Sequence, residues 1–251
     1  MTRNPLLDPN GRLVIAHRGN RVAAPENTIE ALRQAIDLQV DAIEFDVRMT
    51  RDGIPVLMHD ATVNRTTDGD GALNTLSLAD VRTLNAGPSP TTGKERVGVP
   101  TLEEVFEQFP TTPFVIEVKE LAAATATERM VRRFDAANRV VVGSAETPVM
   151  EHFYRTGIPC CASMKDAALL IPFGLLGLKP PKPFYDVLSL TSRYMGLPIP
   201  IRHMAASARR VGVPTQVWTV NDPAEARSLW ASGIAAIVSD DPAAILRART
   251  Q

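Results

Sequence analysis

Two acidic residues, Glu44 and Asp46, lie two positions apart inside the otherwise apolar run 43–47. Side chains at alternate positions of a β-strand project from the same face, so both carboxylates should leave one side of a buried strand. Burying two adjacent carboxylates is costly unless a positive group lies between them. A divalent cation held by oxygen ligands meets that requirement, and the pair therefore marks where chemistry is expected.

A third acidic residue, Glu117, alternates with Lys119 in the apolar run 114–119. If this run is the strand next to that of Glu44 and Asp46, the three carboxylates share one edge of the sheet. Three carboxylates with water form a reasonable site for a hard cation. Ca²⁺ or Mg²⁺ fits better than Zn²⁺ because the ligands are all oxygens. We therefore predict these three acids as metal ligands.

The competing interpretation of the acidic pair is structural. In it the carboxylates serve as ion-pair partners of Arg18, Arg48 or Lys119. For an isolated Glu-x-Asp pair that interpretation is favoured, because buried charges in proteins are usually paired. The third acid shifts the balance toward a metal site.

Two of the four histidines, His17 and His59, lie beside these acids in the predicted fold. His17 ends an apolar run and precedes Arg18, whose planar guanidinium suits a phosphate group. His59 precedes Asp60. Each histidine alone is unremarkable for a strand end or a turn. Together, one can accept a proton from a nucleophile and the other can protonate a leaving oxygen, while a cation and Arg18 or Lys119 neutralise phosphoryl charge.

The remaining aromatic and imidazole groups are weaker candidates. Trp218 falls in the predicted strand 215–220, where an indole can form an apolar wall for a substrate's carbon skeleton or simply pack. His152 and His203 fall on helix-like segments and are interpreted as structural or solvated.

Eight short apolar runs follow one another, mostly separated by stretches with helical spacing of apolar residues. The predicted strands are 13–17, 41–47, 114–119, 140–144, 160–163, 186–190, 215–220 and 235–239. The predicted helices are 27–38, 102–109, 128–136, 148–154, 203–211, 223–230 and 242–249. This alternation predicts an α/β fold, a (β/α)₈ TIM barrel forming a single domain over 1–251, with a doubly wound sheet as the alternative. The barrel is favoured because polar residues recur at the strand ends, which a barrel gathers on one rim.

Two segments exceed a minimal barrel. Residues 54–100 predict a small insertion after the second strand, with an extended piece at 54–59 and a loop at 87–98. Residues 168–178 form an apolar stretch that is too short to span a bilayer and is interrupted by Pro and Gly. That stretch either packs on the barrel or forms an apolar, lipid-facing rim.

Composition narrows the class of protein. The chain has 251 residues and a net charge of −1, which gives no reason to expect nucleic acid as a partner. The adjacent Cys160 and Cys161 are expected to be reduced thiols, because a disulfide between neighbours is strained. The same near-neutral charge gives no reason to expect an anionic membrane as the main partner. The first twelve residues lack the apolar core of a signal peptide, and no segment has the length of a membrane span. These features predict a cytoplasmic protein; the oligomeric state stays open.

Taken in order, the motifs resemble those of the glycerophosphodiester phosphodiesterase family. The matching segments are His17-Arg18-Gly19, Pro25-Glu26-Asn27-Thr28, Glu44-Phe45-Asp46-Val47, Thr50-Arg51-Asp52-Gly53, Pro55-Val56, His59-Asp60, Arg65-Thr66-Thr67-Asp68-Gly69, Pro100-Thr101-Leu102, Glu117-Val118-Lys119, Trp218-Thr219-Val220-Asn221 and Ser239-Asp240-Asp241-Pro242. No single motif decides the matter, but their number and order do.

The resemblance implies a TIM barrel that hydrolyses glycerophosphodiesters to glycerol 3-phosphate and an alcohol. It implies that the substrate's own glycerol hydroxyl attacks phosphorus, through a cyclic phosphate that water then opens. It also implies roles for seven of the matched residues. Glu44, Asp46 and Glu117 would be metal ligands, His17 and His59 the acid–base residues, and Arg18 and Lys119 contacts to the phosphate.

Two alternatives accompany this interpretation. An acyl chain accepted by 168–178 would make the protein a lysophospholipase D-type hydrolase in weak contact with lipid. A non-catalytic barrel that binds a phosphoester is disfavoured, because both histidines, the three acids and Lys119 are all present.

Overall fold

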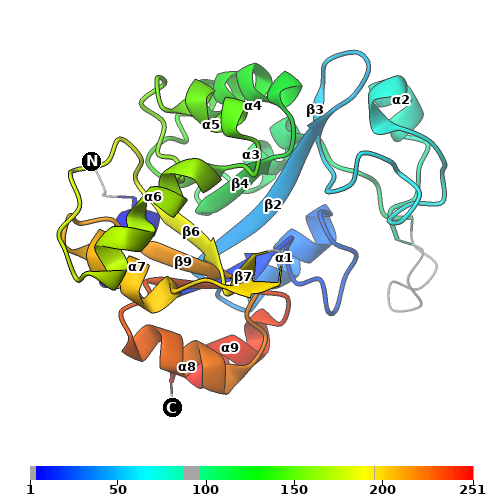
Figure 1. Ribbon diagram of the computed structural model, residues 1–251. Coiled ribbons are helices and arrows are strands. Elements are labelled where there is room, and N and C mark those ends of the chain that lie inside the picture. Colours follow the sequence, from blue (N-terminus) through cyan, green and yellow to red (C-terminus); the bar gives the residue numbers. More distant parts are fainter. Residues whose placement is uncertain (1–3, 88–95, 195, 251) are drawn as a thin grey trace.

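Parallel strands form the wall of a nearly closed barrel (Figure 1). The computed structural model describes residues 4–87, 96–194 and 196–250. The strands of the wall pair in the order β5-β4-β2-β1-β10-β9-β6. Their bounds are β1 (Leu13–His17), β2 (Ala42–Met49), β4 (Phe114–Val118), β5 (Val140–Gly143), β6 (Leu188–Thr191), β9 (Thr215–Trp218) and β10 (Ala236–Ser239). The predicted (β/α)₈ barrel is confirmed, and the doubly wound alternative is wrong.

The fifth predicted strand, 160–163, is reduced to two isolated bridges. Cys160 pairs with Val142 of β5, and Cys161 pairs with Val187 just before β6, both in parallel. These bridges connect the two ends of the sheet. The segment does not continue as a strand because the Ser163 side chain already accepts a hydrogen bond from the Asp166 amide and begins the next helix.

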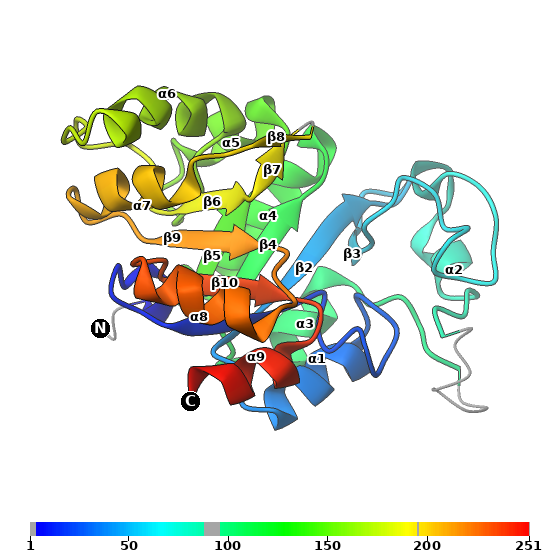
Figure 2. The same cartoon turned by 60° about the horizontal axis from the view of Figure 1, so that its bottom comes forward.

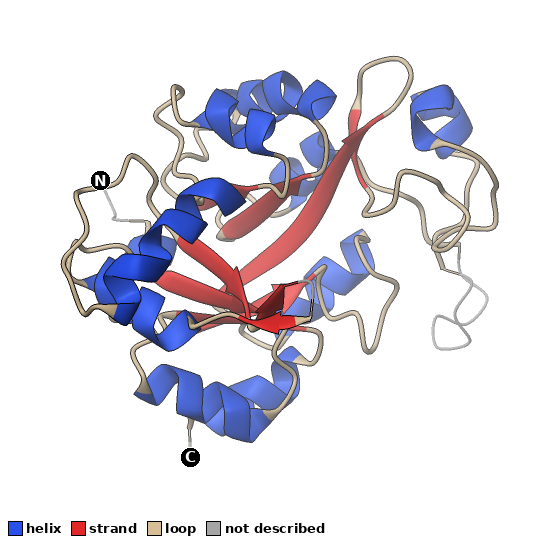
Figure 3. Ribbon diagram, in the orientation of Figure 1, coloured by secondary structure: helices blue, strands red, loops and turns tan. Residues whose placement is uncertain are grey.

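Helices surround the strands on the outside of the barrel (Figure 3). They are α1 (Ile29–Asp37), α3 (Leu102–Gln108), α4 (Leu121–Arg133), α5 (Thr147–Phe153), α6 (Met164–Leu175), α7 (Ile201–Arg209), α8 (Pro223–Ala231) and α9 (Pro242–Arg249); a 3-10 turn, η1 (Pro5–Leu7), precedes β1. Two predicted helices were misplaced: α4 begins seven residues before 128, and α7 begins two before 203. The core fills the space between strands and helices, where the Phe45 and Phe114 rings meet edge-on at 5.1 Å.

Strand register brings the acidic residues to one rim. Glu44 of β2 lies opposite His17 of β1, and Asp46 lies opposite Glu117 of β4. His17 ends β1 and Glu117 is the penultimate residue of β4, so the register places Glu44 and Asp46 beside the carboxyl ends of these neighbouring strands, although β2 itself continues to Met49. Carboxyl ends of strands form the functional rim of a barrel.

The predicted insertion after β2 folds beside that rim. It contains β3 (Pro55–Leu57), which pairs antiparallel with β2, then η2 (Leu73–Thr75) and α2 (Leu78–Val81). It has a small apolar cluster of its own, including Val56, Val63 and Val81. Figure 2 shows this segment beyond the end of β2. The extended piece predicted at 54–59 is confirmed, and part of the loop predicted at 87–98 lies outside the described residues.

The apolar stretch 168–178 lies mostly in α6, which packs on α7. The two backbones approach closely at Gly174: a Cβ added there would lie 2.9 Å from the carbonyl carbon of His203 and the amide nitrogen of Met204. Within the described residues, no helix combines the length and apolar character needed to cross a membrane.

Replacing Gly174 with Ala should destabilise the fold, because the new methyl group collides with backbone that cannot rotate away. We expect a loss of about 1–2 kcal/mol in the free energy of unfolding, although Ala is the better helix former. Thermal unfolding of G174A measures it. G98A is the matched control, since a Cβ there meets nothing within 4 Å. A G174A midpoint equal to that of the wild type would contradict the close approach.

Candidate active site

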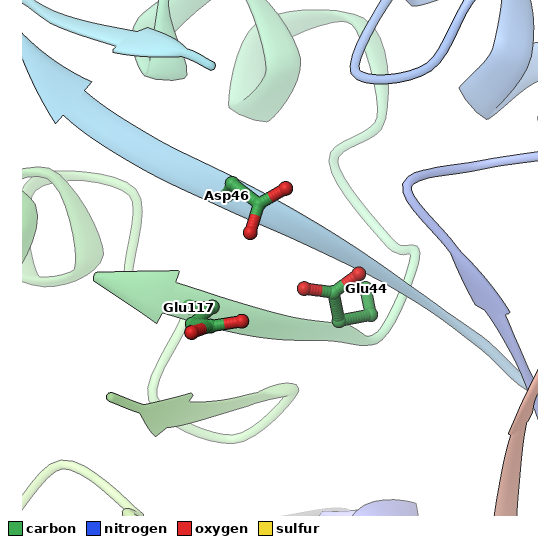
Figure 4. A group of neighbouring side chains, drawn as sticks. All are labelled: Glu44, Asp46 and Glu117. Carbon is green, nitrogen blue, oxygen red and sulfur yellow. The ribbon is translucent and has the colours of Figure 1, made fainter. Parts of the chain in front are cut away.

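Three carboxylates converge at the rim between β2 and β4 (Figure 4). One oxygen of each of Glu44, Asp46 and Glu117 lies within 4.8 Å of the others. Glu44 and Asp46 are buried, whereas Glu117 is partly exposed. The predicted cluster is therefore confirmed as a spatial group, and its chemistry is that of an all-oxygen site for a hard cation.

The charges in this cluster are unevenly balanced. Asp46 lies between the Arg18 Nε at 3.1 Å and the Lys119 Nζ at 3.3 Å, and Lys119 also pairs with Glu117 at 2.8 Å. Glu44 accepts a hydrogen bond from the backbone amide of Arg18 at 3.0 Å, but no lysine or arginine side chain among the described residues forms an ion pair with it. The pairing of Asp46 and Glu117 agrees with the structural interpretation, whereas Glu44 is left with no lysine or arginine side-chain partner among the described residues.

Burial raises the pKa of Glu44 well above its ordinary value, and repulsion from Asp46 and Glu117 adds to the effect. In addition, the Oδ1 atom of Asp46 is buried and accepts no hydrogen bond from any described residue, and its one charged neighbour is the Lys119 Nζ at 3.3 Å. A divalent cation between the three acids would stabilise the ionised Glu44 and could also be bound by that oxygen. The residues present thus fit such an ion.

Backbone geometry sets the position of Arg18 and of the partner of Asp46. Arg18 and Asn27 both have left-handed backbones, with φ of 59° and 58°, and the Asn27 amide donates to the Arg18 carbonyl at 3.1 Å. The Asn27 side chain then holds Asp46 from two sides: its Nδ2 donates to Oδ2 at 2.8 Å, and its Oδ1 accepts from the Asp46 amide at 3.1 Å. Gly19 is required between them, because a Cβ there would lie 2.6 Å from the backbone of Ala31.

Both histidines predicted from the sequence reach this rim. The His17 Nδ1 lies 2.7 Å from an Asp240 carboxylate oxygen, and its Nε2 lies 3.8 Å from Glu44. The His59 Nδ1 lies 2.6 Å from Asp60, and the neighbouring Met58 amide donates to the Asp46 carbonyl at 3.1 Å. In each ring a carboxylate engages Nδ1, so Nε2 is the nitrogen left to exchange protons.

A chain of ion pairs connects the two histidine–aspartate pairs. Asp240 pairs with Arg21 at 3.1 Å, and Arg21 pairs with Glu26 at 2.9 Å. Glu26 pairs with Arg65 at 2.8 Å, and Arg65 pairs with Asp60 at 2.5 Å. The loops that carry the two histidines are therefore held relative to each other through Glu26.

Glu26 lies at the centre of three arginines, since Arg18 also pairs with it at 2.7 Å. Burial by itself would raise the pKa of Glu26, but hydrogen bonds from Arg65 and the charge of Arg18, followed by that of Arg21, lower it to about 2. The residue is ionised across the physiological pH range.

The other predicted groups lie apart from the cluster. Trp218 ends β9 on the same rim, with 45% of its surface exposed, and is available as a wall. Arg48 pairs with Glu120 at 3.1 Å rather than with the cluster. His152 bonds to Glu128 at 2.8 Å, which agrees with its structural interpretation.

Several residues of the site were given no role from the sequence. Glu26 and Asn27 belong to a quoted motif, but nothing in their spacing showed that one holds three arginines and the other orients Asp46. The roles of Arg21, Arg65 and Asp240 were missed for the same reason.

Comparison with known proteins agrees with this geometry. Residues 17–244 match the model of the glycerophosphoryl diester phosphodiesterase family. A glycerophosphodiester phosphodiesterase of Caldanaerobacter subterraneus is 29% identical over 93% of this chain and 96% of its own. One from Bacillus subtilis is 33% identical over 67% of each chain. The structure of an Oleispira antarctica phosphodiesterase in complex with the product sn-glycerol-3-phosphate is 25% identical, with a TM-score of 0.78, and covers 95% of this chain and 97% of that one.

Replacing Glu26 with Gln should destabilise the fold by roughly 3 kcal/mol near neutral pH, because three arginines lose their shared partner. The pKa of Glu26 is lowered from 4.5 to about 2 in the folded state, so its ionised form stabilises the fold above about pH 4.5. That contribution is lost as the pH falls toward 2. The difference in unfolding free energy between wild type and E26Q should therefore shrink over this interval.

Urea denaturation at a series of pH values tests this expectation. E103Q is the control, because Glu103 forms a largely exposed ion pair with Arg133 and should contribute less than about 1 kcal/mol. A wild-type to E26Q difference that stays constant from neutral pH to about pH 3 would show that Glu26 is not the ionic centre of the network.

Proposed function

Because the chain belongs to the glycerophosphoryl diester phosphodiesterase family, we propose that it hydrolyses glycerophosphodiesters to glycerol 3-phosphate and an alcohol. The observation that carries the proposal is the group of three rim carboxylates flanked by two histidines, each held at Nδ1 by an aspartate. The product bound to the Oleispira antarctica relative supports the substrate class.

Glu44, Asp46 and Glu117 would hold the divalent cation, Ca²⁺ or Mg²⁺. The ion would supply positive charge to the phosphoryl oxygens as negative charge develops on them. The fit rests on the convergence of the three carboxylates and on the raised pKa of Glu44, which has no lysine or arginine ion-pair partner among the described residues.

The cationic side chains Arg18 and Lys119 would orient the phosphate through charge-assisted hydrogen bonds. Of His17 and His59, one accepts the proton of the attacking hydroxyl and the other protonates the departing alkoxide. Asp60 would orient the His59 ring and Asp240 the His17 ring, each through Nδ1, leaving Nε2 to exchange protons. Trp218 would form an apolar wall beside the carbon skeleton of the substrate.

Water-soluble diesters are favoured over lysophospholipids as substrates. The relatives act on glycerophosphodiesters, and the bound product carries no acyl chain. We add to the proposal a weak contact with lipid through residues 168–178. We also propose a cytoplasmic location, because both cysteines are free and burial raises the pKa of Cys160 to about 12.

Chelation should abolish hydrolysis of glycerophosphocholine, and added Ca²⁺ or Mg²⁺ should restore it. Replacing a residue that only hydrogen-bonds to a metal ligand lowers metal affinity by roughly 10- to 100-fold. Because Glu117 would be a direct ligand, E117Q should lower the affinity for the ion by more than that. Calorimetric titration with each ion measures the affinity without turnover, and E103Q serves as the charge-matched control. Full activity after exhaustive chelation would contradict the assignment of the metal ligands.

Substitution of either histidine should remove proton transfer without affecting folding. We expect H17A and H59A each to lower kcat by about 10²- to 10⁴-fold, with a thermal midpoint close to that of the wild type. H203A is the control, because His203 is exposed on α7. A near-normal kcat in either variant would refute the role of that histidine.

A further inference from the structure

The outward face of α6 is mostly apolar, with the exposed Lys165 in its first turn. Its inward face buries Ala167, Leu170 and Gly174. The outward positions include Leu169 and Leu175, whose side chains are 61% and 60% exposed. A helix that is apolar on both sides normally has apolar neighbours on both sides, but here only one side is covered by described residues.

Exposed apolar side chains continue beyond the helix. Eight of the eleven large hydrophobic side chains exposed among the described residues lie between positions 164 and 197. We call one group of residues in this region the α6 surface: Met164, Lys165, Leu169, Leu175, Leu176, Leu178, Lys179, Lys182 and Phe184. A concentration of this kind in one part of the fold marks an interaction site rather than scattered exposure.

Charge separates this region from the rest of the chain. Residues 164–210 contain seven Lys or Arg and two Asp, a net charge of +5 within a chain whose total is −1. The Asp166 carboxylate accepts hydrogen bonds from the hydroxyl groups of Tyr154 and Ser163. Lys165, Lys179 and Lys182 are exposed along the apolar stripe. Apolar side chains bordered by lysines form the pattern that binds anionic lipid interfaces.

We propose that the α6 surface docks the protein on a bilayer that contains anionic lipid. This extends the weak lipid contact of the proposed function to a defined surface and lipid charge. A second copy of the chain fits less well, because a twofold dimer would bring two faces of like charge together. A single acyl chain also fits less well, because the outward side of a helix on the barrel wall offers no enclosing groove.

The position of α6 sets the orientation of the docked protein. The helix follows a parallel segment of the wall and runs back antiparallel to the strands, so its first residue lies toward the functional rim. In Figure 2, α6 lies along the outer edge of the molecule. Docking along this edge would hold the barrel on its side and leave the rim open to water. The enzyme would thus be held near the membrane while taking water-soluble diesters.

Co-sedimentation with lipid vesicles tests the proposal without using turnover. The wild type should sediment with vesicles containing about one third phosphatidylserine and much less with pure phosphatidylcholine, because each basic side chain near an anionic surface changes partitioning by roughly fivefold. K179Q/K182Q should weaken binding at least about tenfold. L169Q/L176Q should weaken vesicle binding whatever the phosphatidylserine content of the vesicles. Binding by the wild type should also fall as salt is raised.

Matched controls remove the same groups elsewhere. L121Q removes an exposed leucine of α4, and R129Q/R247Q removes two exposed charges outside 164–210. Both should bind vesicles like the wild type. Thermal midpoints verify that every variant is folded, and hydrolysis of glycerophosphocholine in the absence of vesicles should be unchanged in the α6-surface variants.

Three results would overturn the proposal. One is no sedimentation of the wild type with either vesicle, and another is equal binding by K179Q/K182Q. The third is a concentration-dependent dimer in sedimentation velocity that L169Q/L176Q abolishes, which would assign the surface to a second copy. A wild-type protein that binds the vesicles but does not hydrolyse glycerophosphocholine would instead count against the proposed function. The failure of one proposal can therefore be distinguished from the failure of the other.

Discussion

The structure of the rim depends on the two acidic side chains buried on β2, Glu44 and Asp46. Asp46 is completely buried, and Arg18, Lys119 and Asn27 surround its carboxylate. These partners come from the turn after β1, the end of β4 and the segment before α1. Two of them require left-handed backbone, a conformation that costs of order 1 kcal/mol or more in non-glycine residues. The hydrogen bonds to Asp46 and its neighbours offset that cost, so loop conformation and site charge depend on each other.

Outside this centre, ion pairs connect the rim loops to one another. His17 and His59 lie on different segments, one ending a barrel strand and the other following the insertion strand β3. The chain of pairs through Glu26 links those segments across the rim. Because each carboxylate has at least two partners, no single rotamer change releases a histidine. A barrel wall supplies the strand ends, and this network supplies the relative position of the groups they carry.

The sequence allowed prediction of the strands and the acids because both follow simple periodicity. Alternation placed Glu44, Asp46 and Glu117 on one face, and their register confirmed it. Periodicity failed for α4, whose first turns bury the small Ala123 and Ala124 rather than large apolar residues. Periodicity also could not show that the adjacent residues Asp240 and Asp241 have different roles. Asp241 caps α9 through the Ala244 amide, whereas Asp240 holds His17, and adjacent acids carry no local mark of that division.

The stretch 168–178 shows why hydropathy along the chain could not decide between a packed helix and a lipid-facing one. The inward side of α6 combines Leu170 with two small residues, whereas the outward side carries exposed leucines. Gly174 and Ala167 occupy the inward side and let α7 approach closely, whereas Leu169 and Leu175 point outward. A helix selected only for packing would reverse that distribution, since large apolar side chains gain most from burial. The outward leucines, each about 60% exposed, therefore gain less from packing than buried leucines would, and the lysines around them match an anionic lipid surface. An acyl-binding rim would instead require those leucines to line the mouth of the barrel, where the carboxylates and histidines lie.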